Sequence, residues 1–96
     1  MITIYKYSIL LKDNFEIEMP VGATVLSFQV QRSVPCIWVQ VNTNMPLEKR
    51  RFALKGTGHN LDNITEEIEK YIGTIQLENG GLIFHLFELR DEGMPF

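Results

Sequence analysis

The chain has 96 residues, of which 45% are hydrophobic and 22% charged, and its formal net charge at pH 7 is -3. This size and composition predict one globular domain over residues 1–96 and exclude an intrinsically disordered chain. The acidic balance excludes a protein that coats DNA, since such a protein needs a clustered positive surface.

Cysteine content and hydropathy bear on the compartment. Cys36 is the single cysteine, so the chain forms no internal disulfide and a reducing compartment is expected. Residues 1–15 carry Lys6 and no small-residue cleavage site after an apolar block, which argues against a secretory signal. No apolar run approaches the roughly 20 residues that span a bilayer. We therefore predict a cytoplasmic protein that does not contact a membrane.

Strand-like segments dominate the first part of the chain. Residues 2–11 are rich in β-branched and aromatic side chains, and polar and apolar residues alternate over 15–19, 24–31 and 36–42. A basic segment, 49–55, follows with the same period of two. Turn-forming residues separate these segments, so the pattern predicts short antiparallel strands.

The second part ends in a predicted hairpin. Residues 61–70 predict either one short helix or an acidic loop. Segments 71–77 and 82–89 flank Asn79-Gly80, a pair typical of a type I′ turn. The last segment is apolar on both faces, which predicts a central strand covered on both sides. Residues 90–96 are expected to form a flexible tail.

These elements together predict the fold class. About seven strands and at most one short helix favour an all-β domain, either a single compact antiparallel sandwich or a small barrel.

The segment KGTGHN, residues 55–60, is the first candidate site. Glycines at 56 and 58 allow close approach of the backbone, and successive N–H groups in such a turn form an anion-binding nest. Thr57 and His59 add side-chain donors. The alternative is an ordinary tight turn after a solvated edge strand.

Cations gather just before this turn. Four of the nine Lys and Arg residues lie within 49–55. Alternation places Lys49, Arg51 and Lys55 on one face of the strand. Arg50 then lies on the opposite face, with the apolar residues of the same segment. Guanidinium and ammonium groups suit phosphate, so a phosphorylated ligand is expected here.

The predicted strand 36–42 carries the second candidate, Trp38. Trp38 shares its face with Cys36 and Gln40, and the preceding strand offers Gln29 and Gln31. A tryptophan flanked by amides suits stacking on a base, docking on a polypeptide or contact with a second copy. The alternative is a partly buried core residue.

Neither catalysis nor metal binding has a local motif. His59 and His85 are the only histidines, and Asp62 is close enough in sequence to orient the ring of His59 as a general base. No Ser or Cys lies in a nucleophile context, and paired zinc ligands are missing. We therefore predict no enzyme activity, no metal and no cofactor. His85 is interpreted as a strand histidine hydrogen-bonded within the fold, with a ligand contact as the alternative.

Six segments resemble, in this order, a family of small uncharacterised proteins of tailed bacteriophages, a domain of unknown function. They are IYKYSI (4–9), FQVQ (28–31), VPCIWVQV (34–41), RRFALKGTGH (50–59), YIGTIQ (71–76) and GGLIFHLFE (80–88). The resemblance covers nearly the whole chain. It implies phage origin and the cytoplasm of an infected bacterium as the location, but little about mechanism.

Phage origin favours a virion component, a regulator or an inhibitor of host defence. The leading hypothesis is a self-associating, non-enzymatic protein that captures a small phosphorylated, nucleotide-like ligand, as a sponge for a defence messenger would. Its ligand-binding residues are expected to be Trp38, Arg50, Arg51, Lys55, Gly56, Thr57, Gly58 and His59. The alternative is a protein-binding module, either an inhibitor of a host protein or a virion assembly factor, that docks through the Trp38 face.

Overall fold

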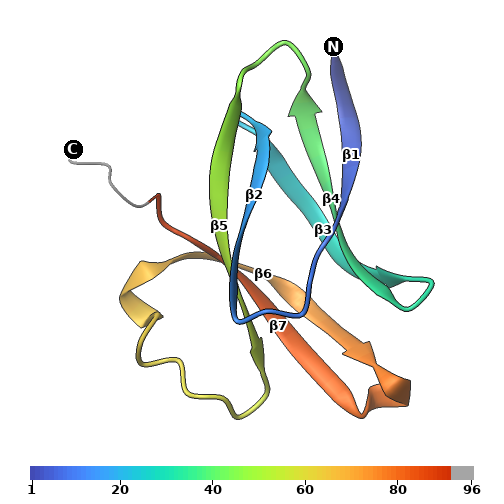
Figure 1. Ribbon diagram of the computed structural model, residues 1–96, viewed down its shortest axis with the longest axis vertical. Helices are drawn as coiled ribbons and strands as arrows, with labels where there is room; N and C mark the ends of the chain where they lie inside the picture. Colours follow the sequence, from blue (N-terminus) through green and yellow to red (C-terminus); the bar gives the residue numbers. More distant parts are fainter. Residues whose placement is uncertain (92–96) are drawn as a thin grey trace.

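The computed structural model describes residues 1–91, which form seven strands in two antiparallel sheets. Sheet A has the order β1 (Ile2–Ser8), β4 (Val34–Asn42), β3 (Thr24–Gln31). Sheet B has the order β2 (Asn14–Pro20), β5 (Leu47–Gly56), β7 (Leu82–Leu89), β6 (Ile68–Leu77) (Figure 1). Two short 3-10 turns, η1 (Thr65–Glu67) and η2 (Glu78–Gly80), complete the described elements. The predicted all-β class is confirmed.

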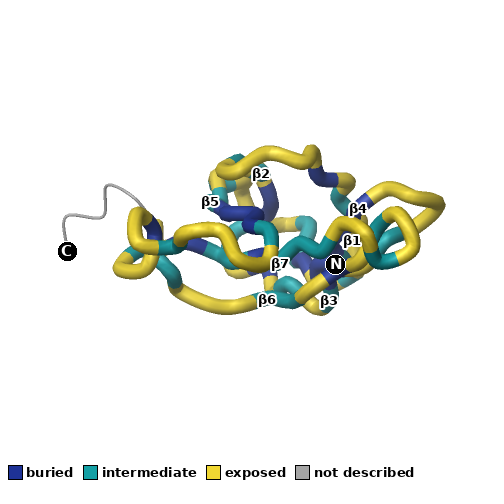
Figure 2. Tube along the Cα trace, turned by 90° about the horizontal axis from the view of Figure 1, so that it is seen from below, coloured by how far each residue is buried: buried dark blue, intermediate teal, exposed yellow. Residues whose placement is uncertain are grey.

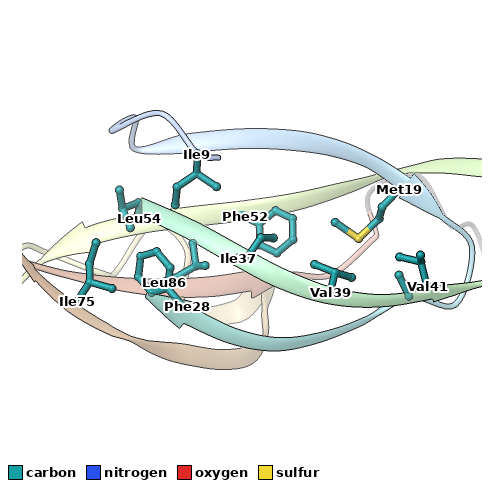
Figure 3. Close-up of a cluster of buried hydrophobic side chains, with 11 residues drawn as sticks. Ile9, Met19, Phe28, Ile37, Val39, Val41, Phe52, Leu54, Ile75 and Leu86 are labelled. Atoms are coloured by element: carbon teal, nitrogen blue, oxygen red, sulfur yellow. The ribbon is translucent and has the colours of Figure 1, made fainter. Parts of the chain in front are cut away.

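The main core lies between the two sheets. Period-two alternation directs apolar side chains of both sheets inward, where they meet (Figure 3). Most buried residues lie in strands, above all in β4 and β5, whereas most of the connecting segments are exposed (Figure 2). The largest fully buried side chains are Met19, Ile37, Val39, Val41, Phe52 and Leu86.

A second, smaller cluster covers part of the outer face of sheet B. The segment 57–67 leaves the end of β5 and loops back to the start of β6 (Figure 1). Ile64 from this segment packs with Ala53 of β5 and Leu89 of β7. Strand β7 therefore has apolar cover on both sides and lies between β5 and β6, as its sequence predicts.

The acidic segment 61–70 forms neither a full helix nor a plain loop. Ile64 and Thr65 both donate backbone hydrogen bonds to the carbonyl of Leu61, and η1 follows for a single turn. Ile68 is already extended, at φ -68° and ψ 119°, and pairs with Leu89. The helix stops because burial of Ile64 and strand pairing of Ile68 outweigh the weak helical propensity of so short a segment.

The β6–β7 hairpin closes as predicted through Asn79-Gly80. Asn79 has φ 53° and ψ 35°, and Gly80 has φ 92°. The N–H of Gly81 donates to the carbonyl of Glu78 over 2.9 Å. These values are those of a type I′ turn, whose second central position glycine occupies without a steric penalty.

The β3–β4 hairpin uses the same left-handed geometry without glycine. Gln31 pairs with Val34, and the two residues between them, Arg32 and Ser33, have φ values of 51° and 68°. Side chains with a Cβ are strained in this region. The backbone of this turn is therefore slightly strained, and a glycine at either position would relieve the strain.

Ser33→Gly is expected to raise the free energy of unfolding by about 0.5–1 kcal/mol, because glycine adopts this φ freely. The matched control is Ser8→Gly at the extended end of β1, where glycine should lower stability by a similar amount. Urea denaturation of the three proteins measures both changes. A less stable Ser33→Gly protein would contradict the strained turn.

The predicted tail, 90–96, lies mostly outside the described residues. Arg90, which is described, donates its backbone N–H to the carbonyl of Glu67 over 2.7 Å. Within residues 1–91 no helix is long and apolar enough to cross a membrane.

Candidate functional site

A pocket of ≈ 280 Å³ opens on the outer face of sheet B, where β5 ends. We call it the Lys55 pocket. Paired residues of neighbouring antiparallel strands project to the same face of a sheet. Lys55 pairs with His85, and Tyr71 pairs with Phe87, so the strand register brings these side chains together at the base of the pocket. Its lining consists of residues 55–59 together with Leu61, Tyr71, His85 and Phe87.

Lys55 is the most unusual residue of this pocket. Its relative exposure is 7%, yet it has no hydrogen bond or ion pair with any residue in the described part of the chain. Among residues 1–91, every side-chain nitrogen or oxygen that is inaccessible to solvent has a hydrogen-bond partner. Because the ammonium of Lys55 has no partner, it is accessible to solvent, at the surface of the pocket that Lys55 lines. An accessible ammonium without a partner can donate charge-assisted hydrogen bonds to an anion that enters the pocket.

The sheet topology shows that β5 is not an edge strand, which was the alternative interpretation of the basic segment. β5 lies between β2 and β7, inside sheet B. The segment 57–67 lies against the end of β5, where Ile64 packs on Ala53 and Leu61 lines the pocket with Lys55. Lys55 is therefore largely buried, while Lys49, on the same face, is exposed.

The turn that follows Lys55 holds the ring of His59 in place. The N–H of Gly56 donates to Nδ1 of His59 over 3.1 Å, and the N–H of His59 donates to the carbonyl of Gly56 over 3.1 Å. Because Nδ1 accepts a hydrogen bond, the neutral ring carries its proton on Nε2. That N–H is a donor at the rim of the pocket. Asp62, the expected orienting residue, instead donates its backbone N–H to the side chain of Asn60.

Glycine at position 56 is required by the closeness of this ring. A Cβ at Gly56 would lie 2.9 Å from Cε1 and 3.0 Å from Nε2 of His59. Such distances force the imidazole to move and break its hydrogen bond to the backbone.

Gly56→Ala is therefore expected to lower the free energy of unfolding by about 1 kcal/mol, the value of one lost hydrogen bond. In a His59→Ala background the same substitution should cost less than about 0.5 kcal/mol, because its clash has been removed. A double-mutant cycle by urea denaturation measures the difference. Gly73→Ala is the matched control, since its Cβ would meet nothing closer than 3.7 Å. Equal losses from Gly56→Ala in both backgrounds would contradict the ring contact.

His85 occupies the centre of a hydroxyl network on the same face. Its Nε2 lies 2.7 Å from Oγ1 of Thr57, and its Nδ1 lies 2.9 Å from Oγ1 of Thr74 and 3.2 Å from the hydroxyl of Tyr71. The hydroxyls of Tyr71 and Thr74 are also hydrogen-bonded to each other. The interpretation of His85 as a strand histidine bonded within the fold is confirmed. His85 also lines the Lys55 pocket, so the alternative interpretation, a ligand contact, stays a prediction.

An irregularity in β6 makes this network possible. Residues three apart in a regular strand face opposite sides of the sheet. The register of β6 against β7 shifts between Tyr71 and Gly73, and this bulge turns Tyr71 to the side on which Thr74 lies.

Two predicted arginines lie outside the pocket. Arg50 points to the inner face of β5, where its Nη2 donates to Glu88 over 3.0 Å and its Nη1 donates to the carbonyl of Ala23 over 2.9 Å. The hydrogen bond to Glu88 raises the pKa of Arg50, against the opposing effect of burial. Arg51 binds Glu67 over 2.9 Å and so connects β5 to η1.

Trp38 is also separate from the Lys55 pocket. It lies in the middle strand of sheet A, between Lys6 on β1 and Ser27 on β3. The shallow pocket that it lines contains Ser27, Val30 and the two predicted glutamines, Gln29 and Gln31. The structure thus confirms the neighbours predicted for Trp38 and places none of residues 50–59 beside it.

Sequence reasoning missed Leu61, Tyr71, Thr74 and Phe87 as site residues. Phe87 was within reach, because it follows His85 by two residues and so shares its face. Tyr71 was not, since its orientation depends on the bulge. In residues 1–91 no group of three or more His, Cys, Asp or Glu side chains is placed to hold a metal ion. The donors of the site are ammonium, hydroxyl and ring N–H groups, which together suit an oxyanion.

Comparison with known proteins adds a family but no activity. No curated protein and no solved structure matches the chain. One family model matches residues 1–95 and is described as a domain of unknown function. This range contains the core, the Lys55 pocket and the Trp38 face. The chain therefore belongs to the DUF7352 family.

Proposed function

We propose that the protein binds a small phosphorylated ligand in the Lys55 pocket without transforming it. The observation that carries this proposal is Lys55, a largely buried lysine whose ammonium has no partner in the described chain and lines the pocket. A phosphate there would receive hydrogen bonds from Lys55, from Nε2 of His59 and from the hydroxyl of Thr57. Charge-assisted bonds of this kind are about twice as strong as neutral ones.

Binding without turnover is the form of the proposal that the site supports. His59, the candidate general base, has its Nδ1 occupied by a backbone N–H rather than by a carboxylate. No carboxylate lines the pocket. A bound ester would therefore meet donors but no acid–base pair oriented for its hydrolysis.

The test is a thermal-shift and calorimetry panel of phosphate esters against the purified protein. We expect phosphorylated compounds to raise the melting temperature and the same compounds without phosphate to leave it unchanged. A panel in which no phosphorylated compound binds would refute the proposal. Release of the bound compound by denaturation, followed by mass spectrometry, should return it with its mass unchanged; a hydrolysed product would refute the absence of turnover.

The biological role that we propose is sequestration of a nucleotide messenger of bacterial defence by a phage protein in the host cytoplasm. The sequence resemblance described above supports it, together with the phosphate-binding chemistry of the pocket. Native mass spectrometry of protein purified from bacteria with an induced nucleotide-signalling defence tests it. We expect an oligomer that retains a phosphorylated compound. A monomer that carries nothing and binds no nucleotide afterwards would contradict both the role and the self-association.

A second candidate is docking of a host or virion protein on sheet A. It is favoured by Trp38 at the centre of the outer face, near the exposed side chains of Ile4 and Leu26, which are 56% and 48% exposed. Trp38→Arg should then abolish recovery of a stoichiometric partner from infected-cell lysate and leave phosphate binding unchanged. Unaltered recovery with Trp38→Arg would exclude this face.

A further inference from the structure

The Lys55 pocket adjoins a second pocket across the turn 56–59. The second pocket has a volume of ≈ 370 Å³ and shares Gly56, Thr57 and His59 with the first. Its remaining lining comes from residues 81–84, at the start of β7. The two pockets therefore have a common wall where β5 ends. Phe84 packs against the core between the sheets, so Leu82 and Phe84 project to the opposite face of β7 from His85.

The chemistry on the two sides of this wall differs. Both pockets have apolar lining, from Leu61 and Phe87 in the first and from Leu82, Ile83 and Phe84 in the second. They differ in charge, because only the Lys55 pocket contains an ammonium group. Apart from His59, no ionisable side chain lines the second pocket. It is therefore unsuited to an anion and suited to an apolar or aromatic group.

The ring of His59 marks the boundary and is fixed there. Gly56 holds its Nδ1, and the ring lies against the Cα of Gly56, where even a methyl group would be only 2.9 Å away. A ligand that occupies both pockets passes the three residues that they share, Gly56, Thr57 and His59. A planar ring system can do so in contact with the imidazole, since aromatic rings associate favourably in stacked or edge-on arrangements.

We propose that the ligand spans both pockets, with its phosphate at Lys55 and a planar ring, such as a nucleobase, against Leu82 and Phe84. This inference rests on the proposed function, because it takes the phosphate site as given. Ligand pockets commonly measure about 300–1,000 Å³. Each pocket alone is at or below the lower part of this range, and the two together reach its middle. The ligand class is therefore a phosphate ester of an aromatic base rather than a simple sugar phosphate.

Calorimetry with three probes tests the inference on the unaltered protein. The probes are inorganic phosphate, ribose 5-phosphate and adenosine 5′-monophosphate. We expect adenosine 5′-monophosphate to bind at least about tenfold more tightly than ribose 5-phosphate, as one stacked ring commonly provides. Equal affinities for these two probes would overturn the inference while leaving the proposed function intact. Failure of all three would overturn both.

Leu82→Ser locates the ring. Leu82 is 43% exposed, so its replacement should leave the fold intact. We expect a several-fold loss of affinity for adenosine 5′-monophosphate and an unchanged affinity for ribose 5-phosphate. The matched control is Leu26→Ser, which removes a leucine of similar exposure, 48%, from sheet A and should alter neither affinity. An equal loss for both probes with Leu82→Ser, or no loss, would contradict a base in the second pocket. If this variant does not fold, the comparison of the three probes on the unaltered protein still tests whether a base adds to the affinity.

Discussion

Lys55→Met is expected to lower the affinity for phosphate esters by about 10- to 100-fold, the range that corresponds to one lost hydrogen bond between charged groups. Methionine retains the length and the apolar stem of lysine but removes the ammonium. Since Lys55 is buried, its stem should remain packed in the variant. Calorimetry with a phosphate ester that binds the unaltered protein measures the loss.

The stability of the same variant distinguishes a binding residue from a structural one. Because the ammonium has no partner among the described residues, its removal should leave the free energy of unfolding unchanged or raise it by up to about 1 kcal/mol. The control is Lys49→Met on the same face of β5, where the lysine is exposed. It should alter neither quantity. A Lys55→Met protein that binds phosphate esters as before would remove Lys55 from the site.

Arg50→Ala is expected to have the opposite profile, with a large loss of stability and intact binding in the folded protein. The side chains of Arg50 and Glu88 are only 17% and 13% exposed. Truncation of the arginine leaves the carboxylate of Glu88 and the carbonyl of Ala23 without this donor. Breaking a buried pair costs about 3–5 kcal/mol. Because this pair keeps some contact with water, we expect a loss near about 3 kcal/mol, which lowers the melting temperature of so small a domain by more than about 10 °C.

The double variant Arg50→Met, Glu88→Leu distinguishes the effect of the unpaired charge on stability from the effect of lost packing. Replacement of both partners by apolar side chains should restore most of the lost stability, because no charge is then left buried alone. Arg90→Ala is the control for a surface pair: Arg90 lies 3.7 Å from Glu69, and both side chains are more than half exposed. It should cost less than about 0.5 kcal/mol. If Arg50→Ala were as mild as Arg90→Ala in urea denaturation, the pair would have no structural role.

The alternation of polar and apolar residues was enough to predict much of this arrangement. Period two in 49–55 separates Arg50 from Lys55, and the structure places them on opposite faces of β5. The turn Asn79-Gly80 was predictable because few residue pairs suit a type I′ geometry. Strand β7 was assigned to the centre of a sheet because both of its faces are apolar. These features follow from local rules that act within a few residues.

The pocket itself was beyond such rules. Lys55 is buried because the segment 57–67 packs on sheet B through Ile64, a contact that involves residues distant in sequence. The neighbours of His85 depend on the register of three strands. Whether Trp38 lies beside the basic strand could not be predicted for a similar reason, since membership of one sheet or the other is decided by long-range pairing.

The bulge in β6 has a consequence for how related chains can be compared. One additional residue between Tyr71 and Gly73 turns the tyrosine hydroxyl toward His85. If Ile72 paired with Phe87 in a regular ladder instead, Tyr71 would move on to pair with Glu88 and its side chain would project to the opposite face, away from the pocket. The presence of this bulge, more than the identity of any one side chain, is therefore the character by which DUF7352 members that keep the hydroxyl network can be sorted from those that share only the fold.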